Sequence, residues 1–300
     1  MNQAHGTSER LTLLLIPPTV EVAASLASCD VDRAFIDLEV LGKRERQGHL
    51  AAHFTHHTIE ELPRYREAVR GAELLVRTNP LHGGSADELE RVLEHGPDVV
   101  MLPMFRHPRE VEAYLRMLRG RAKVNLLVET PQAAVRLDEI LRVGPIDEVH
   151  VGLNDLHLAL GLDFMFELVT SGILASLAQT CAEHCVRFGF GGVARVEEGA
   201  VPGRIILGEH VRLGSTAVIL SRTFTRRASS AELVDAGELA MAVAEARRVE
   251  AAWRRAKPEE MEGNREVLRE CVRAVTQQAR RKDEVPSTDR FTSAPSGALP

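Results

Sequence analysis

The stretch VNLLVETPQAAVRLDEILRVGPIDEVHVGLNDLHLALG, residues 124–161, decides the fold. Its first five residues are almost all apolar, which is typical of a strand buried on both faces, and an apolar pattern returns at residues 149–153. Between them, Thr130 and Pro131 are typical of a helix start, apolar residues follow at helical spacing, and Gly144 ends the helix. The stretch therefore predicts a strand, a helix and a second strand that lies parallel to the first.

Each of these two strands is followed by a carboxylate, Glu129 after the first and Asp155 after the second. Because parallel strands end at the same edge of a sheet, we expect the two carboxylates to lie close together. Two oxygen ligands suit a hard divalent cation, Mg²⁺ or Mn²⁺, which keeps positions open for water and substrate. The alternative is that Glu129 caps a helix and Asp155 takes part in an Asx turn.

Length and composition favour one large domain with additions. A chain of 300 residues with 44% apolar content can bury one large core, and residues 11–230 suit a (β/α)8 TIM barrel. Residues 1–10 form a polar tail, and residues 285–300, rich in Ser and Pro, predict a disordered tail. We expect the last strand near residues 211–220. A helical C-terminal extension then follows over residues 231–284.

Charge and hydropathy exclude several classes of function. A net charge of −6 argues against binding to nucleic acid or to a membrane surface. No run of about 18 apolar residues occurs, and the first ten residues are polar, so we expect neither a spanning helix nor a signal peptide. A cytoplasmic location follows. The four cysteines fit reduced, mostly buried thiols.

Several motifs, in their order along the chain, resemble those of the HpcH/HpaI aldolase and citrate-lyase beta-subunit family. They are FIDLE at 35–39, VRTN at 76–79, LPM at 102–104, LLVET at 126–130 and GLND at 152–155. The resemblance extends from about Phe35 to about Phe224. It implies a (β/α)8 barrel in which Glu129 and Asp155 hold a divalent metal that chelates a 2-oxo acid or an enolate. It also implies that Arg77 points at the substrate oxygen that becomes the enolate.

The residue types at the other strand ends suit this chemistry. The guanidinium of Arg77 is always charged and offers forked donors, which a developing oxyanion requires; the alternative is a salt bridge to an acid at the barrel rim. From the strand pattern we expect Asp37 and Glu39 to point to opposite faces, so that only one of them faces into the barrel. We expect Glu39 to lie in the site and Asp37 to have a structural role.

Glycine-rich strand ends predict the substrate contacts. Gly191 and Gly192 end the expected seventh strand, where the absence of a side chain lets the backbone approach a ligand closely. Loops after strands seven and eight of a barrel commonly hold phosphate, so a phosphorylated or carboxylated group is expected there. Gly152 and Asn154, directly before Asp155, are further candidates for substrate binding.

The proton carrier is the main departure from the family pattern. Family aldolases carry a His directly after the acidic residues of the second strand, and citrate-lyase-like members usually show a second acid, but this chain has Val40. A histidine from the following loop would have to substitute, and His49 and His53, which share a helix face with His57, come nearest. A water on the cation is the competing candidate.

The lysines favour metal-assisted chemistry over a Schiff base. A Schiff-base aldolase needs a lysine that projects into the barrel mouth. Of the four lysines, Lys123 starts a strand and the others lie in a charged loop or in the terminal helices. We therefore predict a metal-dependent carbon–carbon lyase or aldolase that acts on 2-oxo acid and aldehyde substrates through a pyruvate-like enolate. The alternatives are a citrate-lyase-like CoA-thioester lyase and a non-catalytic metal-binding barrel that serves in binding or assembly.

The C-terminal helices predict assembly. Leu239, Met241, Val243 and Trp253 are apolar, and a barrel closed by eight strands leaves no strand for them to cover. We therefore expect a homo-oligomer, and the family resemblance implies a trimer or a hexamer.

Overall fold

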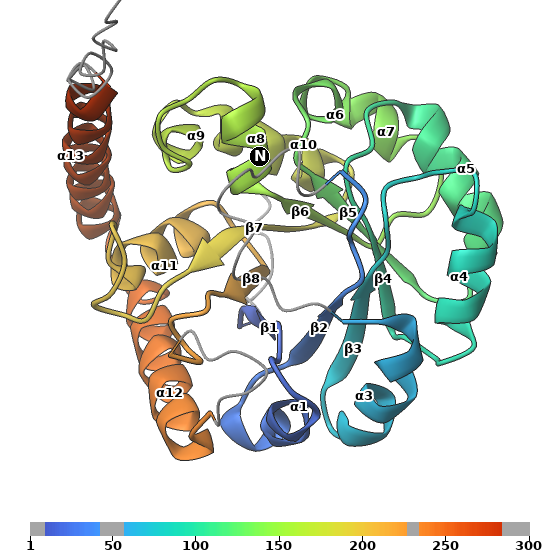
Figure 1. Ribbon diagram of the computed structural model, residues 1–300. Helices are drawn as coiled ribbons and strands as arrows, with labels where there is room; N and C mark the ends of the chain where they lie inside the picture. Colours follow the sequence, from blue (N-terminus) through green and yellow to red (C-terminus); the bar gives the residue numbers. More distant parts are fainter. Residues whose placement is uncertain (1–9, 43–56, 227–233, 284–300) are drawn as a thin grey trace, which may run out of the picture.

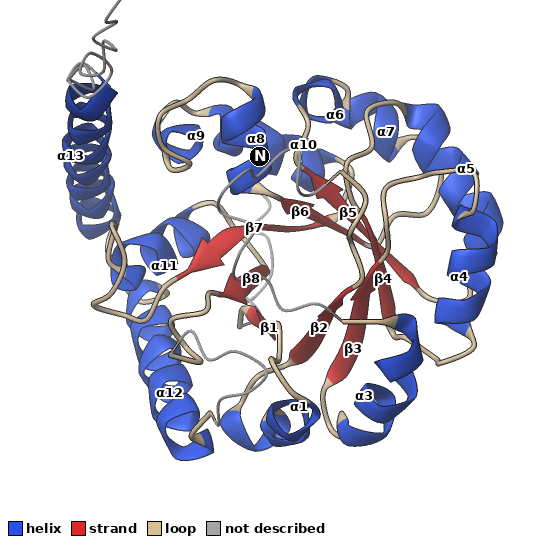
Figure 2. Ribbon diagram, viewed as in Figure 1, coloured by secondary structure: helices blue, strands red, loops and turns tan. Residues whose placement is uncertain are grey.

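The computed structural model describes residues 10–42, 57–226 and 234–283. Parallel strands within this part of the chain close into an eight-stranded barrel in sequence order, surrounded by helices (Figures 1 and 2). The strands are β1 (Thr12–Leu15), β2 (Arg33–Asp37), β3 (Glu73–Arg77), β4 (Val99–Leu102), β5 (Lys123–Val128), β6 (Glu148–Val151), β7 (Arg187–Val193) and β8 (Ala217–Leu220). Since β8 pairs with β1, the barrel is closed, and the predicted (β/α)8 fold is confirmed.

The helical layer follows the expected alternation with two differences. Its members are α1 (Val20–Ser25), η1 (Ala27–Cys29), η3 (Ile59–Glu61), α3 (Leu62–Ala68), α4 (Ser85–Leu93), α5 (Pro108–Leu118), α6 (Pro131–Val135), α7 (Leu137–Leu141), α8 (Leu153–Ala159), α9 (Glu167–Thr170), α10 (Ile173–Glu183), α11 (Gly203–Arg212), α12 (Ala236–Trp253) and α13 (Pro258–Asp283). The helix expected after Thr130 is split into α6 and α7 at Arg136. The strand expected near residues 211–220 is shorter, because α11 continues to Arg212 and β8 begins only at Ala217.

Side chains alternate between the inside of the barrel and the helical layer. The outward-facing side chains pack with the helices into one large core. A second, smaller cluster of buried apolar side chains fills the barrel interior: Leu14, Phe35, Leu75, Val99, Met101, Leu127 and Ala217. The interior is therefore packed rather than open. This apolar layer separates the polar side chains at the N-terminal ends of the strands from those at the C-terminal ends.

Charged side chains occupy the interior at the N-terminal ends of the strands. Arg33, only 1% exposed, donates from Nη1 to Glu148 Oε2 at 2.7 Å and from Nε to Glu73 at 3.0 Å. Asn125 Nδ2 donates to the same Glu148 oxygen at 2.9 Å, and Lys123 Nζ lies 2.8 Å from Glu73. Buried charges are tolerated when each is paired, so removing one partner should be costly.

The Glu148→Gln variant, which removes one partner of the buried ion pair, should lower the free energy of unfolding. Burial raises the pKa of Glu148, but the hydrogen bonds and charge of Arg33 outweigh burial and lower the pKa from 4.5 to about 2. The stabilisation is therefore complete above pH 4.5 and is lost as the pH falls toward 2; it amounts to roughly 3 kcal/mol. We expect the variant to unfold at lower urea than the wild type at pH 7, and the difference between their unfolding free energies to shrink below pH 4.5.

A matched control is Glu90→Gln, which removes an exposed carboxylate whose two oxygens each lie 2.6 Å from Arg121. Exposed ion pairs contribute little to stability, so its unfolding midpoint should stay close to the wild type. A Glu148→Gln midpoint that matches the control at pH 7 would show that the interior pair does not stabilise the fold.

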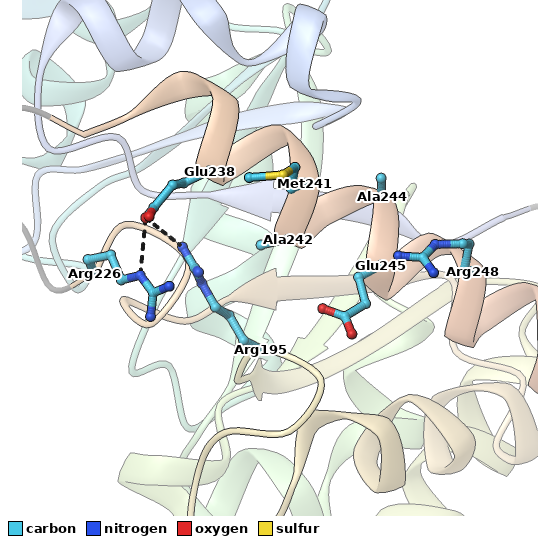
Figure 3. A pocket seen from close by; sticks show the side chains of 8 residues that line it. All are labelled: Arg195, Arg226, Glu238, Met241, Ala242, Ala244, Glu245 and Arg248. Atoms are coloured by element: carbon cyan, nitrogen blue, oxygen red, sulfur yellow. Dashed lines mark hydrogen bonds and ion pairs between the residues drawn. The ribbon is translucent and has the colours of Figure 1, made fainter.

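Helix α12 takes the place of the eighth helix of the barrel. It packs against η1 and α11, it buries Leu239 and Val243, and Glu250 Oε1 accepts a 2.6 Å hydrogen bond from the Leu11 amide at the start of β1. At its other end, Glu238 lies 4.0 Å from Arg195 and 3.2 Å from Arg226, which follow β7 and β8 (Figure 3). The helical layer of the barrel thus extends beyond residue 230, where we expected an extension to begin.

Helix α13 packs on α9 and α11 and extends along the side of the barrel (Figure 1). Its buried residues include Leu268 and Asn264, whose Nδ2 donates to Ile205 O at 3.0 Å. The apolar residues that suggested a partner subunit are therefore covered largely by the chain itself, although Met241 is 67% exposed. The homo-oligomer therefore stays a prediction, and the apolar residues of the C-terminal helices no longer support it. None of the described helices is long and apolar enough to cross a membrane.

Candidate active site

Asp37 and Arg77 form an ion pair at the C-terminal ends of β2 and β3. The two residues are register partners on neighbouring strands. Arg77 donates from Nε and from Nη2 to the two Asp37 carboxylate oxygens, each at 2.8 Å. The guanidinium carbon also lies 5.4 Å from the ring centre of Phe35. Because a bidentate pair and a ring beneath it fix the planar group, Arg77 is held in one orientation at the barrel rim.

Glu39 joins this pair. Its Oε2 lies 3.4 Å from Arg77 Nη2, and its amide donates to Asp37 Oδ1 at 3.1 Å. Our expectation that only one of the two acids faces the site was therefore wrong. Residues two apart on a strand lie on the same face, so Asp37 and Glu39 share a face, and assigning them to opposite faces misapplied the alternation. Both acids contact Arg77, and Asp37 belongs to the site as much as Glu39 does.

Glu129 lies within electrostatic range of the same arginine. Burial lowers the pKa of Arg77, but the negative charges of Asp37, Glu39 and Glu129 outweigh it and raise the pKa well above its ordinary value. Arg77 is therefore charged at every pH at which the protein folds. The described part of the site combines the fixed cation of Arg77 with three buried carboxylates.

A backbone amide and a glycine lie beside the carboxylate of Glu129. The Met104 amide donates to Oε1 at 3.1 Å, and Met104 adopts a left-handed conformation, with φ 56°, at the turn after β4. A Cβ at position 152 would lie 2.9 Å from Glu129 Oε2, so a glycine there avoids a clash with the carboxylate. Thr130 rather than Glu129 caps α6, because its side chain accepts from the Ala133 amide. Helix capping therefore does not explain Glu129.

Asp155 lies in the first turn of α8, one turn beyond Gly152, and is buried. Within the described residues, no group of three or more His, Cys, Asp or Glu side chains could hold a metal by itself. The two acids supply carboxylate oxygens, which are the donors that Mg²⁺ and Mn²⁺ prefer, and these ions keep several waters or substrate oxygens. Glu129 and Asp155 are the residues that would hold such a cation.

The three other residues predicted to bind substrate, Asn154, Gly191 and Gly192, differ in exposure and in how tightly the chain packs around them. Asn154 is exposed on the first turn of α8. Gly191 has a φ of 43°, and a Cβ there would lie 2.7 Å from Leu153 Cδ1, so its missing side chain serves close packing within the chain. A Cβ at Gly192 would make only ordinary contact with Ile219 O, at 3.6 Å. Of these three residues, Gly191 is therefore the one that the local packing requires.

The histidines predicted as proton carriers, His49 and His53, lie outside the described residues. His57, which we placed on the same helix face, is buried beneath the site. Its Nδ1 accepts from the Asp37 amide at 3.1 Å, so Nε2 carries the proton and donates to Pro17 O at 3.0 Å. Burial lowers the pKa of His57. Both ring nitrogens are used, and His57 supports Asp37 instead of carrying a proton.

Three positioning groups were missed in the sequence: Asn79, Glu88 and the Met104 amide. Asn79 Oδ1 accepts from the amides of Val40 and Leu41, at 2.9 and 3.0 Å, and so holds the loop that carries Glu39. Glu88 Oε1 in turn accepts from the Asn79 side chain and amide. The signal was present, because Asn79 closes the VRTN motif. The Met104 amide had no such signal, since a backbone conformation determines its role.

His82 lies on the loop after β3 but is not available for proton transfer either. Its Nε2 lies 2.9 Å from Glu88 Oε2, and its Nδ1 accepts from the Gly84 amide at 3.0 Å. As with His57, both ring nitrogens have partners within the protein. Neither of these two histidines near the rim can therefore serve as a general base in this arrangement.

Comparison with known proteins agrees with the fold. No curated protein sequence matches the chain. The fold is similar to an HpcH/HpaI aldolase from Desulfitobacterium hafniense DCB-2, with a TM-score of 0.55 and 14% identity over 71% of this chain and 86% of that chain. It is also similar to an HpcH/HpaI aldolase/citrate lyase family protein from Burkholderia cenocepacia J2315, with a TM-score of 0.57 and 16% identity over 73% and 91%.

At these identities the structural likeness shows the fold alone. The family model described as HpcH/HpaI aldolase/citrate lyase matches residues 19–166, the part of the chain that carries Glu39, Arg77, Glu129 and Asp155. This match identifies residues 19–166 as a region of the HpcH/HpaI aldolase/citrate lyase type, a family of aldolases and lyases.

Proposed function

We propose that the protein is a divalent-metal-dependent carbon–carbon lyase that acts on a 2-oxo acid through a pyruvate-like enolate. The observation that carries the proposal is the fixed guanidinium of Arg77, whose contacts with Asp37 and Glu39 use Nε and Nη2. Nη1 makes none of these contacts, which leaves its donors for a ligand. A charged, preoriented donor beside metal-type carboxylates is what stabilisation of an enolate oxygen requires.

A cation held by Glu129 and Asp155 would polarise the carbonyl of the oxo acid. In the cleavage direction, a base removes the proton of the 4-hydroxyl group, the C3–C4 bond breaks and an aldehyde leaves. The bonding electrons pass into the enolate, whose oxygen Arg77 stabilises by donation. Protonation at C3 then gives pyruvate. Because Asp37 and Glu39 already fix Arg77, little reorganisation is needed as the negative charge develops.

The proton at the 4-hydroxyl group needs a carrier. His57 and His82 have partners on both ring nitrogens, so they cannot accept it without breaking a hydrogen bond. His49 or His53 is therefore our proposal for this role, in place of the family histidine that Val40 replaces. A positioned general base contributes about 10²–10⁴-fold to the rate, so a substitution of the correct histidine should be visible in kcat.

The test of the proposal is a direct assay of cleavage. Purified protein is incubated with 4-hydroxy-2-oxo acids and Mg²⁺ or Mn²⁺, and release of pyruvate is followed. We expect release that requires the cation and stops with EDTA. Cleavage of CoA thioesters without any pyruvate release would contradict the proposal in favour of a citrate-lyase-like activity. Absence of both activities would favour a binding or assembly protein.

A further inference from the structure

A buried histidine lies inside the barrel, below the candidate site. His150 is 1% exposed and lies on the inward-facing side of β6 together with Glu148. Its Nε2 lies 3.1 Å from Gly191 O, and its Nδ1 is buried without a hydrogen-bond partner in the described residues. Since a carbonyl oxygen only accepts, Nε2 carries the proton. Burial lowers the pKa of His150 to about 4, so this neutral form persists at neutral pH.

The carbonyl that His150 binds belongs to an irregularity in the sheet. Along the β7–β8 ladder, Gly189 pairs with Ala217 and Gly192 pairs with Ile219, so β7 advances three residues while β8 advances two. An extra residue of this kind is a β-bulge, which locally interrupts the ladder and re-aims the backbone. The left-handed φ of Gly191, 43°, fits the bulge. His150 supplies a donor for Gly191 O at this interruption.

The residues around the imidazole make room for it. A Cβ at Gly189 would lie 2.8 Å from His150 Nδ1 and 2.7 Å from Ala217 O. A Cβ at Gly191 would lie 2.7 Å from Leu153 Cδ1. His150 and the two glycines therefore fit together as one set, because a larger residue at either glycine would displace the ring or the bulge.

The bulge reaches the candidate site through Leu153. Gly191 packs against Leu153, the residue directly after Gly152. Gly152 in turn lies so close to Glu129 that a Cβ on it would touch the Glu129 side chain. We propose that His150 is a positioning residue: its Nε2–H group holds the Gly191 carbonyl and thereby fixes the glycine bulge of β7 against the strand end that lines the Glu129 carboxylate. The inference rests on the proposed function, because it assigns the bulge to the binding of a 2-oxo acid.

The test compares two substitutions at His150. His150→Gln keeps an N–H group that can donate to Gly191 O, whereas His150→Leu fills the space without a donor. Binding of oxalate, a planar dicarboxylate resembling the pyruvate enolate, is measured by calorimetry with saturating Mg²⁺. We expect His150→Leu to weaken oxalate binding by roughly five- to tenfold, as for one lost hydrogen bond, and His150→Gln to stay within about twofold of the wild type. For pyruvate release, KM should rise while kcat changes less.

The matched control is His210→Leu. His210 is fully buried, its Nδ1 bonds Ser215 Oγ at 2.8 Å, and its ring stacks on Phe190 of β7 at 3.7 Å, but from the helical side of the strand. Its Nε2, like His150 Nδ1, has no partner in the described residues. His210→Leu should lower the denaturation midpoint while oxalate affinity stays at the wild-type level. If both leucine variants lose affinity equally, His150 acts only through general stability and the proposal is overturned.

Hydrogen exchange of the peptide covering residues 187–195 gives a readout without any ligand. We expect faster exchange in His150→Leu than in His150→Gln or His210→Leu. Wild-type affinity and wild-type exchange in His150→Leu would overturn the proposal. If His150→Leu does not fold, His150→Asn, whose shorter amide cannot reach Gly191 O, replaces it. Failure of the wild type to bind oxalate would instead contradict the proposed function, and the exchange data would still decide whether His150 holds the bulge.

Discussion

Replacement of Arg77 by lysine is expected to lower kcat/KM for pyruvate release by about 10²–10³-fold, the usual cost of losing one positioned oxyanion donor. Lysine keeps the positive charge but loses the fork that bonds both oxygens of Asp37 and also contacts Glu39. An ammonium that pairs with Asp37 cannot also present an oriented donor to a substrate oxygen. The measurement is steady-state kinetics at saturating Mg²⁺, with the far-UV spectrum as a check of folding.

Arg91→Lys serves as the control for this variant. Arg91 is exposed, and its ion-pair partner in the described part of the chain is the exposed carboxylate of Glu60. Its activity should match the wild type, because exposed pairs tolerate exchange of one cation for another. A loss below about threefold in Arg77→Lys would show that the fork is not used in the reaction, since it falls far short of the cost of an oxyanion donor.

The second large effect is expected for Glu129→Gln. The amide side chain has the shape of the carboxylate and can still accept the Met104 amide hydrogen bond, so the fold should be preserved. It lacks the charge that a divalent cation requires. Since substitutions outside the ligand shell already cost 10–100-fold in metal affinity, loss of a ligand charge should cost at least about 100-fold. Activity should fall with metal occupancy.

Calorimetric titration with Mn²⁺ measures this effect directly. Glu139→Gln is the matched control, because Glu139 lies exposed on the neighbouring helix α7. It should bind Mn²⁺ as the wild type does. If Glu129→Gln binds Mn²⁺ with wild-type affinity, the cation is held elsewhere and the assignment of Glu129 is wrong.

The sequence predicted those features that depend on local periodicity and on the direction of strands. Glu129 and Arg77 follow apolar strands, and all strands of a parallel barrel end at the same rim, so their placement at one rim needed no coordinates. The role of Asp37 was missed because it depends on the cross-strand register with Arg77. Asp37 and Glu39 are two residues apart, so strand alternation places them on one face, and the expectation of opposite faces misapplied that pattern.

Other features depend on contacts between distant parts of the chain. His150 bonds Gly191, 41 residues away, and nothing in the local pattern EVHV indicates that partner. The alternation of β6 did offer a partial signal, because a polar His150 between Glu148 and Gly152 faces the barrel interior. The C-terminal helices were predicted as elements, but the packing of α12 over the junction of β8 and β1 follows only from barrel closure.

The central claim, that the protein forms a metal-dependent enolate of a 2-oxo acid, is tested most directly by proton exchange. Pyruvate is incubated with the protein in D₂O, with and without Mg²⁺ or Mn²⁺, and loss of the methyl proton signal is followed by NMR. We predict exchange above the protein-free rate that requires the cation and falls strongly in Arg77→Lys and Glu129→Gln. No exchange above the protein-free rate, or exchange that persists unchanged with EDTA, would contradict the account.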